Sequence, residues 1–257
     1  DVQVGDIVLT RGQRLGAAQL GAAAAVGCAT LDVHRPPRVL VLSTGSELVE
    51  PGSPLEHGQI YESNGPMLAA AVRTAGGTAE LVRFVADDVA AFLAALRPRL
   101  ETVDLVLTSG GVSAGAYEVV KDALAERGVE FVKVAMQPGK PQGAGRLDGT
   151  PVIALPGNPV SALVSFEIFV RPALLAAGGH AVTSRPRVTA ELAGALSSPA
   201  DRRQYRRAVY ADGAVSLVGG PGSHLLVALA AANCLVEIPE EVAKLPAGAT
   251  VDALLLD

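Results

Sequence analysis

Between Arg38 and Gly179 the sequence alternates short apolar runs with longer segments of helical composition. The apolar runs are bounded by Pro, Gly or polar turn residues, a pattern typical of buried strands. Strands that alternate with helices form a mostly parallel sheet, because each crossover helix returns the chain to the same end of the sheet. We therefore predict an α/β fold with helices on both faces. Asn64 is expected to cap its helix. Strands are expected at 39–42, 80–84, 103–108, 129–134 and 152–155, and helices at 67–75, from the Asp87-Asp88 pair to 96, at 117–127 and at 161–175.

Two further segments flank this region. Segment 1–37 has helical composition at 15–26, an extended piece at 30–33 and a hinge at Pro36-Pro37. From 183 to 257 the long helical pattern is lost, and short apolar runs are separated by Gly and Pro. This predicts a small β-barrel-like domain with one helical turn near 225–231. Its strands are expected at 187–192, 206–210, 215–218, 234–238 and 250–255.

Composition excludes several functional classes. The net charge is −5 and there is no Trp, so we expect no nucleic-acid partner, because such binders are basic and stack bases on aromatic rings. No purely apolar stretch is long enough to span a bilayer, and no membrane partner is expected. Cys28 and Cys234 are too few for a disulfide framework, and no Cys/His cluster has zinc spacing. The expected location is a reducing cytoplasm.

Three loops that follow predicted strands, at 43–47, 109–115 and 156–161, carry glycine, hydroxyl or amide groups. In open α/β sheets ligands bind outside the carboxyl ends of the strands, so these loops are expected to meet at one edge. Glycine lets backbone N–H groups approach an oxyanion, and a helix N-terminus favours its charge. A fourth loop, 137–141, places Lys140 between two prolines. Together the loops predict a cradle for a phosphate-bearing small molecule.

Each feature also has a purely structural interpretation. A Gly-Gly pair can be only a turn. Asn158 followed by Pro159 is a good helix start, Asp87 can simply cap its helix, and Lys133 and Lys140 can be solvated surface charges. The expected position of all of them at one sheet edge favours a binding site. The sequence lacks the G-x-G-x-x-G and P-loop patterns, so an ordinary dinucleotide or P-loop site is not expected.

The order and spacing of these motifs resemble the molybdopterin molybdenumtransferases, the family of bacterial MoeA and of the gephyrin E domain. The matching motifs are Ser-Thr-Gly-Ser-Glu-Leu at 43–48, Gly-Gln-Ile-Tyr-Glu-Ser-Asn at 58–64, Ser-Gly-Gly-Val-Ser at 109–113, Pro-Gly-Lys-Pro at 138–141 and Leu-Pro-Gly-Asn-Pro-Val-Ser at 155–161. The resemblance implies that 1–37 is the end of an elongated helical domain, 38–179 a molybdopterin-binding domain and 183–257 a C-terminal β-domain. It also implies that the family's N-terminal region and inserted second domain are missing here.

The resemblance further implies an activity, the insertion of molybdate into adenylylated molybdopterin with release of AMP in a Mg²⁺-dependent step. Glu47, Asp87 and Glu118 are implied to hold Mg²⁺ and, with Lys133 and Lys140, to form the catalytic set. Carboxylates suit a hard cation, and lysines neutralise the oxyanions of the substrates. The implied substrate-binding residues are Thr44, Gly45, Asn64, Ser109, Gly110, Gly111, Ser113, Pro156, Gly157, Asn158, Pro159, Ser161 and Ser223.

The sequence departs from the family at Glu118, where Asp is more common, and at Gln137, where some relatives have Lys. The resemblance implies a homodimer, with molybdopterin adenylyltransferase as a further partner. The missing domain would complete the site across the dimer, so this chain alone is expected to bind its substrates weakly and to catalyse poorly.

Two alternative functions stay open. One is molybdopterin adenylyltransferase, which would not need the β-domain, and the other is a non-catalytic, gephyrin-like scaffold.

Overall fold

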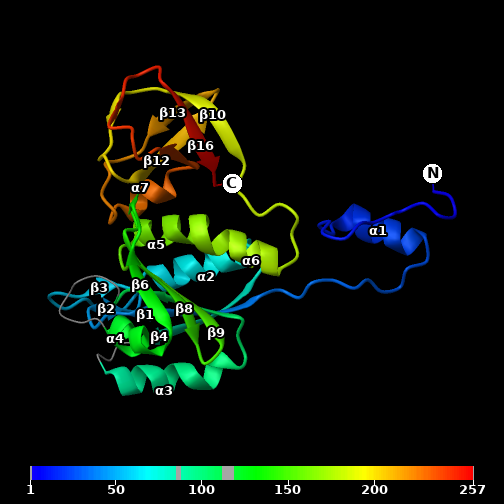
Figure 1. Ribbon diagram of the computed structural model, residues 1–257, viewed down its shortest axis with the longest axis horizontal. Helices are drawn as coiled ribbons and strands as arrows, with labels where there is room; N and C mark the ends of the chain where they lie inside the picture. Colours follow the sequence, from blue (N-terminus) through cyan, green and yellow to red (C-terminus); the bar gives the residue numbers. More distant parts are fainter. Residues whose placement is uncertain (1, 85–87, 112–118, 257) are drawn as a thin grey trace.

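The computed structural model describes residues 2–84, 88–111 and 119–256. Figure 1 shows an α/β region at one end of the molecule and a β-barrel standing on it. Helix α1 (Ala17–Ala25) lies to one side, at the end of an extended arm. The fold class predicted from the sequence is therefore confirmed, since an α/β region precedes a small barrel.

The α/β region is built on a six-stranded sheet of order β4-β1-β5-β9-β8-β6. Strands β4, β1, β5 and β9 are parallel, as the alternating pattern predicts. Strand β8 instead pairs antiparallel with both β9 and β6. The strands are β1 (Arg38–Thr44), β4 (Thr78–Phe84), β5 (Leu105–Ser109), β6 (Val129–Lys133), β8 (Pro141–Leu147) and β9 (Thr150–Leu155).

The sequence does not predict β8, because its Pro-Gln-Gly-Ala-Gly start lacks the β-branched and aromatic residues that favour strands. Its two glycines instead allow a close approach to β6. A Cβ on Gly143 would lie 2.7 Å from the ring of Phe131, and a Cβ on Gly145 would lie 2.0 Å from the carbonyl oxygen of Gly128. A glycine within a strand often marks such a backbone approach.

Helices cover both faces of the sheet, as predicted. Alternate residues of β1 separate the two cores: Leu40 and Leu42 pack with α3 and α4, whereas Val39 and Val41 pack with α2 and with the helical segment from α5 to α6. The elements are α2 (Asn64–Thr74), α3 (Val89–Leu100), α4 (Val119–Leu124), η1 (Ala125–Arg127), α5 (Pro159–Ser165), the π-helical η2 (Phe166–Val170) and α6 (Arg171–Ala177).

The continuous helical stretch Pro159–Ala177 is long and apolar enough to cross a membrane by length and composition alone. However, 56% of the stretch is buried inside the protein, and the core helix of a globular domain passes the same test. Its buried face contributes to the core beneath β1 and β5. The stretch is therefore accounted for as a core helix.

The C-terminal region forms a closed five-stranded barrel of order β13-β10-β16-β14-β12, in which β12 pairs back with β13. This confirms the predicted small β-barrel and its helical turn. The elements are β10 (Arg187–Leu192), β12 (Arg203–Ala211), β13 (Ala214–Leu217), α7 (Leu226–Ala230), β14 (Cys234–Ile238) and β16 (Thr250–Leu255), with short strands β2 (Leu48–Val49), β3 (Ile60–Tyr61), β7 (Met136–Gln137), β11 (Leu196–Ser197) and β15 (Lys244–Leu245) elsewhere.

The barrel is attached to the α/β region by backbone pairing. Strand β7 lies in the loop between β6 and β8, and it pairs parallel with the start of β12. The N–H of Arg203 also donates to the carbonyl oxygen of Ala135 at 3.0 Å. Met136 and Tyr205 belong to an apolar cluster that seals this junction. The loop that carries Lys140 is therefore held by both parts of the molecule.

One predicted cap is wrong. Asn64 is the first residue of α2, and Ser63 occupies the cap position without a side-chain hydrogen bond. The carboxylate of Glu62 caps the helix instead, since it accepts from the N–H of Gly65 at 2.7 Å. The amide of Asn64 is thereby left for contacts across the sheet edge.

Two other local predictions have mixed outcomes. Helix α3 is capped by Asp88, whose carboxylate accepts from the N–H of Ala91 at 2.6 Å. Asp87, the other member of the acidic pair, lies outside the described residues.

The extended piece expected at 30–33 joins no strand of the described sheets. An extended chain that is not paired in a ladder is a linker, which agrees with the hinge at Pro36-Pro37.

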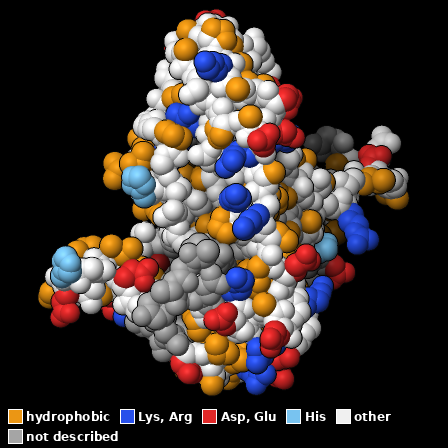
Figure 2. Space-filling model, turned by 60° about the vertical axis from the view of Figure 1, so that its left-hand side comes forward, with side chains coloured by type: hydrophobic (Ala, Val, Ile, Leu, Met, Phe, Trp, Pro, Cys, Tyr) orange, Lys and Arg blue, Asp and Glu red, His pale blue; other side chains and the backbone are white. Residues whose placement is uncertain are grey.

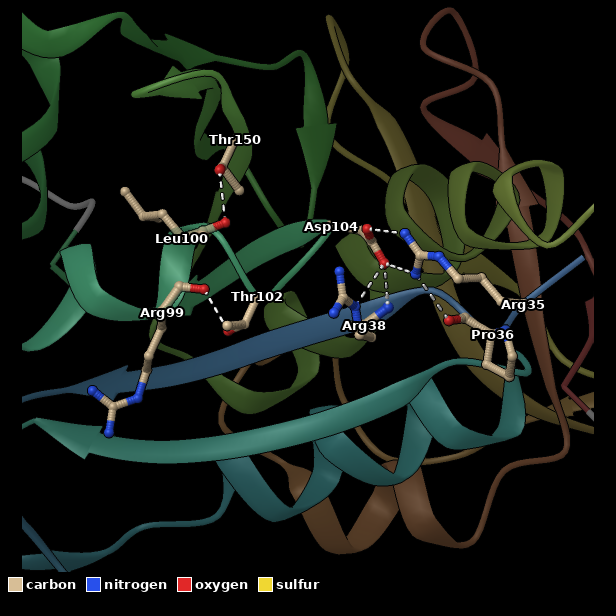
Figure 3. A network of polar contacts seen from close by, with 8 residues as sticks. All are labelled: Arg35, Pro36, Arg38, Arg99, Leu100, Thr102, Asp104 and Thr150. Carbon is tan, nitrogen blue, oxygen red and sulfur yellow. Dashed lines mark hydrogen bonds and ion pairs between the residues drawn. The ribbon is translucent and has the colours of Figure 1, made fainter.

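Asp104 anchors the arm to the sheet, at the strand ends opposite the cavity (Figure 3). Its carboxylate receives two hydrogen bonds of 2.5 Å from the Arg35 guanidinium and one of 2.8 Å from the N–H of Arg38. The hydrogen bonds from Arg35 hold the pKa of Asp104 well below its usual range. Nearby, Thr150 donates to the carbonyl oxygen of Leu100 at 3.1 Å.

We expect Asp104→Asn to lower stability at pH 7 and to flatten the acid limb of the stability curve. A carboxyl with a depressed pKa stabilises the fold above its unfolded pKa, about 3.9, and that stabilisation is lost as the pH falls toward the folded value. Urea unfolding at pH 7, 4 and 3 measures this. The matched control is Asp148→Asn, whose ion pair with Arg97 is exposed and 3.7 Å long. Parallel acid limbs for wild type and Asp104→Asn would contradict the expectation.

Candidate active site

A cavity of about 800 Å³ lies between the barrel and the carboxyl ends of β1, β5 and β9. This is where open α/β sheets bind ligands. Most of the site residues expected from the sequence meet here. Those that line the cavity are Thr44, Gly45, Glu47, Asn64, Ser109, Gly110, Gly111, Lys140, Pro156, Gly157, Asn158, Pro159, Ser161 and Ser223.

Four expected residues do not line the described cavity. Lys133 is exposed at the end of β6, and it does not belong to the cavity wall. Asp87, Ser113 and Glu118 lie outside the described residues. Of the three carboxylates expected to hold Mg²⁺, the described wall therefore shows Glu47. Within the described part of the chain, no cluster of three or more His, Cys, Asp or Glu side chains has the form of a metal site.

The floor of the cavity depends on two adjacent glycines. Gly110 has φ +95°, and a Cβ there would lie 2.5 Å from the carbonyl oxygen of Thr44. Gly111 has φ +66°, and its Cβ would lie 2.8 Å from Val120. Only glycine fits such a left-handed backbone pressed against its neighbours. The loops after β1 and β5 can therefore touch along their backbones, which leaves the cavity open above them.

Asn64 connects the loops after β5 and β9. Its side-chain NH₂ donates to Ser109 Oγ at 2.8 Å and to the carbonyl oxygen of Gly157 at 2.6 Å. Its Oδ1 is buried and has no hydrogen-bond partner among the described residues. A helix residue thereby fixes the separation of two loops that come from neighbouring strands.

Two carboxylates line the cavity with different surroundings. Glu62 is buried, and it accepts from Ser43 Oγ at 3.1 Å and from the N–H of Gly65 at 2.7 Å. Glu47 is exposed and folds over Gly45, with its Oε2 2.7 Å from where a Cβ on that glycine would lie. No ion pair to Glu47 is found within the described residues. Glu62 is engaged in holding the fold, whereas Glu47 is available to a ligand.

Basic groups reach the cavity from both halves of the molecule. Lys140 comes from the α/β region, and Arg202 comes from the turn before β12 in the barrel. Neither cation forms an ion pair with another described residue. Figure 2 shows Lys and Arg side chains along the surface from the barrel down to the α/β region, on a chain whose net charge is −5. Sequence analysis did not predict Arg202 as a site residue. The signal that could have found it is the cluster of arginines in this part of the barrel, Arg202-Arg203 and Arg206-Arg207.

The barrel closes the cavity through Ser223. The carbonyl oxygen of Ser223 accepts from the N–H of Val160 at 3.0 Å, and its Oγ accepts from the side chain of Asn158 at 2.8 Å. His224, beside it, also lines the cavity. The cavity thus combines carboxylate, ammonium, guanidinium and hydroxyl groups over a glycine floor. Such a set can bind a small polar anion together with a counter-ion.

Comparison with known proteins gives the family. Residues 40–176 match the probable molybdopterin binding domain family, which is more than half of the chain, and residues 189–256 match the MoeA C-terminal region, domain IV. The chain belongs to the molybdopterin-binding domain family. Its barrel is similar to the C-terminal region of MoeA proteins.

Related sequences and structures agree with this assignment. The chain is 55% identical over 257 residues to molybdopterin molybdenumtransferase 2 of Mycobacterium tuberculosis, with 96% of this chain and 64% of the relative covered. It is 36% identical to the molybdopterin molybdenumtransferase of Haemophilus influenzae, with 98% and 64% covered. A MoeA structure from Pyrococcus horikosii superposes with a TM-score of 0.84 at 33% identity, with 97% and 62% covered. The chain thus spans less than two thirds of the length of these relatives.

This molybdopterin-binding domain carries Gln137 in the cavity wall, beside Lys140. The Gln137 amide oxygen accepts from the side chain of the buried Gln204, at 3.2 Å, across the β7–β12 pairing. Position 137 is therefore occupied by a neutral group tied to the barrel. The positive charge of the described cavity wall rests on Lys140 and Arg202.

Proposed function

We propose that this protein takes part in molybdenum cofactor biosynthesis by inserting molybdate into adenylylated molybdopterin, with release of AMP. The observation that carries the proposal is the cavity whose wall includes Lys140 and Arg202 together with the Gly110-Gly111 floor. Molybdate and the pyrophosphate of an adenylylated pterin are both oxyanions, and both require cationic and N–H donors. The names of the relatives support the same activity.

The described residues divide the work in this proposal. Lys140 and Arg202 bind and orient the oxyanions, and the glycine floor lets the substrate approach the backbone. Glu47, together with Asp87 and Glu118 outside the described residues, would hold Mg²⁺. When bound, that ion supplies charge neutralisation at the pyrophosphate. Glu47 fits this role because it is an oxygen ligand that no described residue engages.

Larger-scale features belong to the same proposal. We propose that 38–179 is the substrate-binding domain, that 183–257 is the β-domain that closes it, and that 1–37 belongs to a helical domain used in homodimerisation. The protein would act in the cytoplasm and would receive its substrate from a molybdopterin adenylyltransferase. The adenylyltransferase reading of this chain itself is not favoured, because the barrel matches the MoeA C-terminal region. A scaffold alone would not require Lys140 and Glu47 to line a cavity without an ion pair to any described residue.

Calorimetric titration of the chain with AMP, with and without Mg²⁺, tests the proposal. We expect Lys140→Ala to weaken AMP binding about 10-fold or more, because a charge-assisted hydrogen bond contributes on the order of 1.5–3 kcal/mol. Lys244→Ala is the control, since Lys244 lies on β15 and outside the cavity wall. Equal affinity in wild type and Lys140→Ala would overturn the assignment of this cavity.

A further inference from the structure

The loop that delivers Ser223 to the cavity has little structure of its own. It runs from Gly219 to His224, between β13 and α7, and three of its six residues are glycine. Glycine-rich segments lose much conformational entropy on ordering, so the loop needs anchors to hold one conformation. One anchor is the close packing of the loop backbone at Gly219 against Ala228. The φ of Gly219 is +67°, and a Cβ added there would lie 2.9 Å from the Cβ of Ala228.

The second anchor is Arg207, which points from β12 into the loop. Its Nη1 donates to the carbonyl oxygen of Gly222 at 3.0 Å, and its Nη2 donates to the carbonyl oxygen of Gly220. The residue is 4% exposed, and no acidic side chain among the described residues pairs with it. Burial, with a further contribution from Arg206, lowers the pKa of Arg207. A buried guanidinium without a carboxylate is unfavourable unless its donors are used. Here loop carbonyls use Nη1 and Nη2, whereas Nε has no hydrogen-bond partner among the described residues.

The contacts of Arg207 lead directly to the cavity wall. Gly222 precedes Ser223, whose carbonyl and hydroxyl oxygens accept from the N–H of Val160 and the side chain of Asn158. Arg207 does not itself line the cavity. The path therefore runs from a rigid barrel strand, through two loop carbonyls, to a hydroxyl at the mouth of the site.

We propose that Arg207 is a positioning residue that holds the 219–224 loop so that Ser223 and His224 close the ligand cavity. The fork geometry of a guanidinium suits this task, because it can hold two carbonyls at a fixed separation, whereas an ammonium is a single point. The consequence for ligand binding rests on the proposed function. The consequence for loop docking does not.

Two readouts separate these consequences. Hydrogen exchange at the Val160 amide, followed by NMR, reports whether Ser223 remains docked. Titration with AMP reports whether the cavity binds. We expect Arg207→Met to raise the exchange rate of the Val160 amide and the Kd for AMP by about 10-fold each, which is typical of losing a buried charged donor. Arg203→Met is the matched control on the same strand. Arg203 pairs with the largely buried Glu237 and with the exposed Glu240, and it lies outside the cavity wall.

A double-mutant cycle tests whether Arg207 acts through the loop. Ser223→Ala should weaken AMP binding in the wild-type background but not in Arg207→Met, because the loop is already displaced there. Arg207→Lys keeps the charge but not the fork, and it should behave like Arg207→Met. If Arg207→Met fails to fold, the exchange of the Val160 amide and the AMP titration are measured on Arg207→Lys instead.

The outcomes are distinguishable. Unchanged protection of Val160 in folded Arg207 variants would overturn the proposal, as would additive effects of Arg207→Met and Ser223→Ala on binding. Faster exchange at Val160 in a chain whose wild type does not bind AMP would retain Arg207 as the residue that holds the loop, and would count against the assignment of this cavity to AMP. Faster exchange, weaker binding and non-additivity together are the expected result.

Discussion

Gly110→Ala is expected to destabilise the α/β region by about 3 kcal/mol and to abolish AMP binding. Alanine in a left-handed conformation costs roughly 1–2 kcal/mol, and overpacking a filled site costs about 1–3 kcal/mol more. Both terms apply here, because φ is +95° and the new Cβ would lie 2.5 Å from the carbonyl oxygen of Thr44. The β1 and β5 loops must then separate, which displaces the floor beneath the ligand. Urea unfolding and AMP titration measure the two effects.

Gly149→Ala is the matched control for this prediction. Gly149 has φ +88°, so an alanine there bears the same backbone strain, but nothing lies within 4 Å of its Cβ. It sits in the turn between β8 and β9, at the far end of β9 from the cavity. We expect a loss of roughly 1–2 kcal/mol with unchanged AMP affinity. If Gly110→Ala were no more harmful than Gly149→Ala, the close approach of the two loops would not be what the glycine is needed for.

Part of the site, including Gly110, could be predicted from the sequence. The layered fold follows from the period of apolar residues, and the parallel topology then brings the ends of β1, β5 and β9 to one edge. Glycine, hydroxyl and amide residues at the ends of those strands or directly after them, such as Ser109 and Gly110, are therefore placed by local pattern alone. The same logic fails for β8, whose glycines reflect contact with β6 rather than a turn.

Other members of the site depend on how the barrel docks, and no local pattern encodes that. Arg202 reaches the cavity because the turn before β12 is tied to Ala135 and β7. Lys133 was expected in the catalytic set, yet it lies exposed at the end of β6 and outside the described cavity wall. The hydrogen-bond partner of Ser223 on α5, the N–H of Val160, is likewise visible only in three dimensions. Sequence therefore predicts the half of the site that one sheet builds, and docking determines the other half.

Asn64→Asp is the second change with a large expected effect, because it preserves the shape of the side chain and removes an amide donor that bonds both loops. The Asn64 amide donates to Ser109 Oγ and to the carbonyl oxygen of Gly157. An ionised carboxylate would instead face that carbonyl, a second acceptor, at a distance of 2.6 Å. We expect a loss of about 2–3 kcal/mol at pH 8 from the unsatisfied and partly buried charge. AMP binding should weaken too, because a negative charge enters the anion site.

The pH dependence of this variant identifies the cause. Repulsion by Gly157 and partial burial raise the pKa of the new carboxyl above the unfolded value of about 3.9. A raised pKa means that the deficit is present at high pH and is relieved as the pH falls through the folded pKa, where the protonated acid can again donate to Gly157. Asn233→Asp is the control, since Asn233 bonds the backbone of Tyr210 in the barrel and lies outside the cavity wall. It should lose stability without losing AMP affinity. Unchanged stability of Asn64→Asp at pH 8 would show that the amide acts by shape alone, and that its two hydrogen bonds do not hold the loops together.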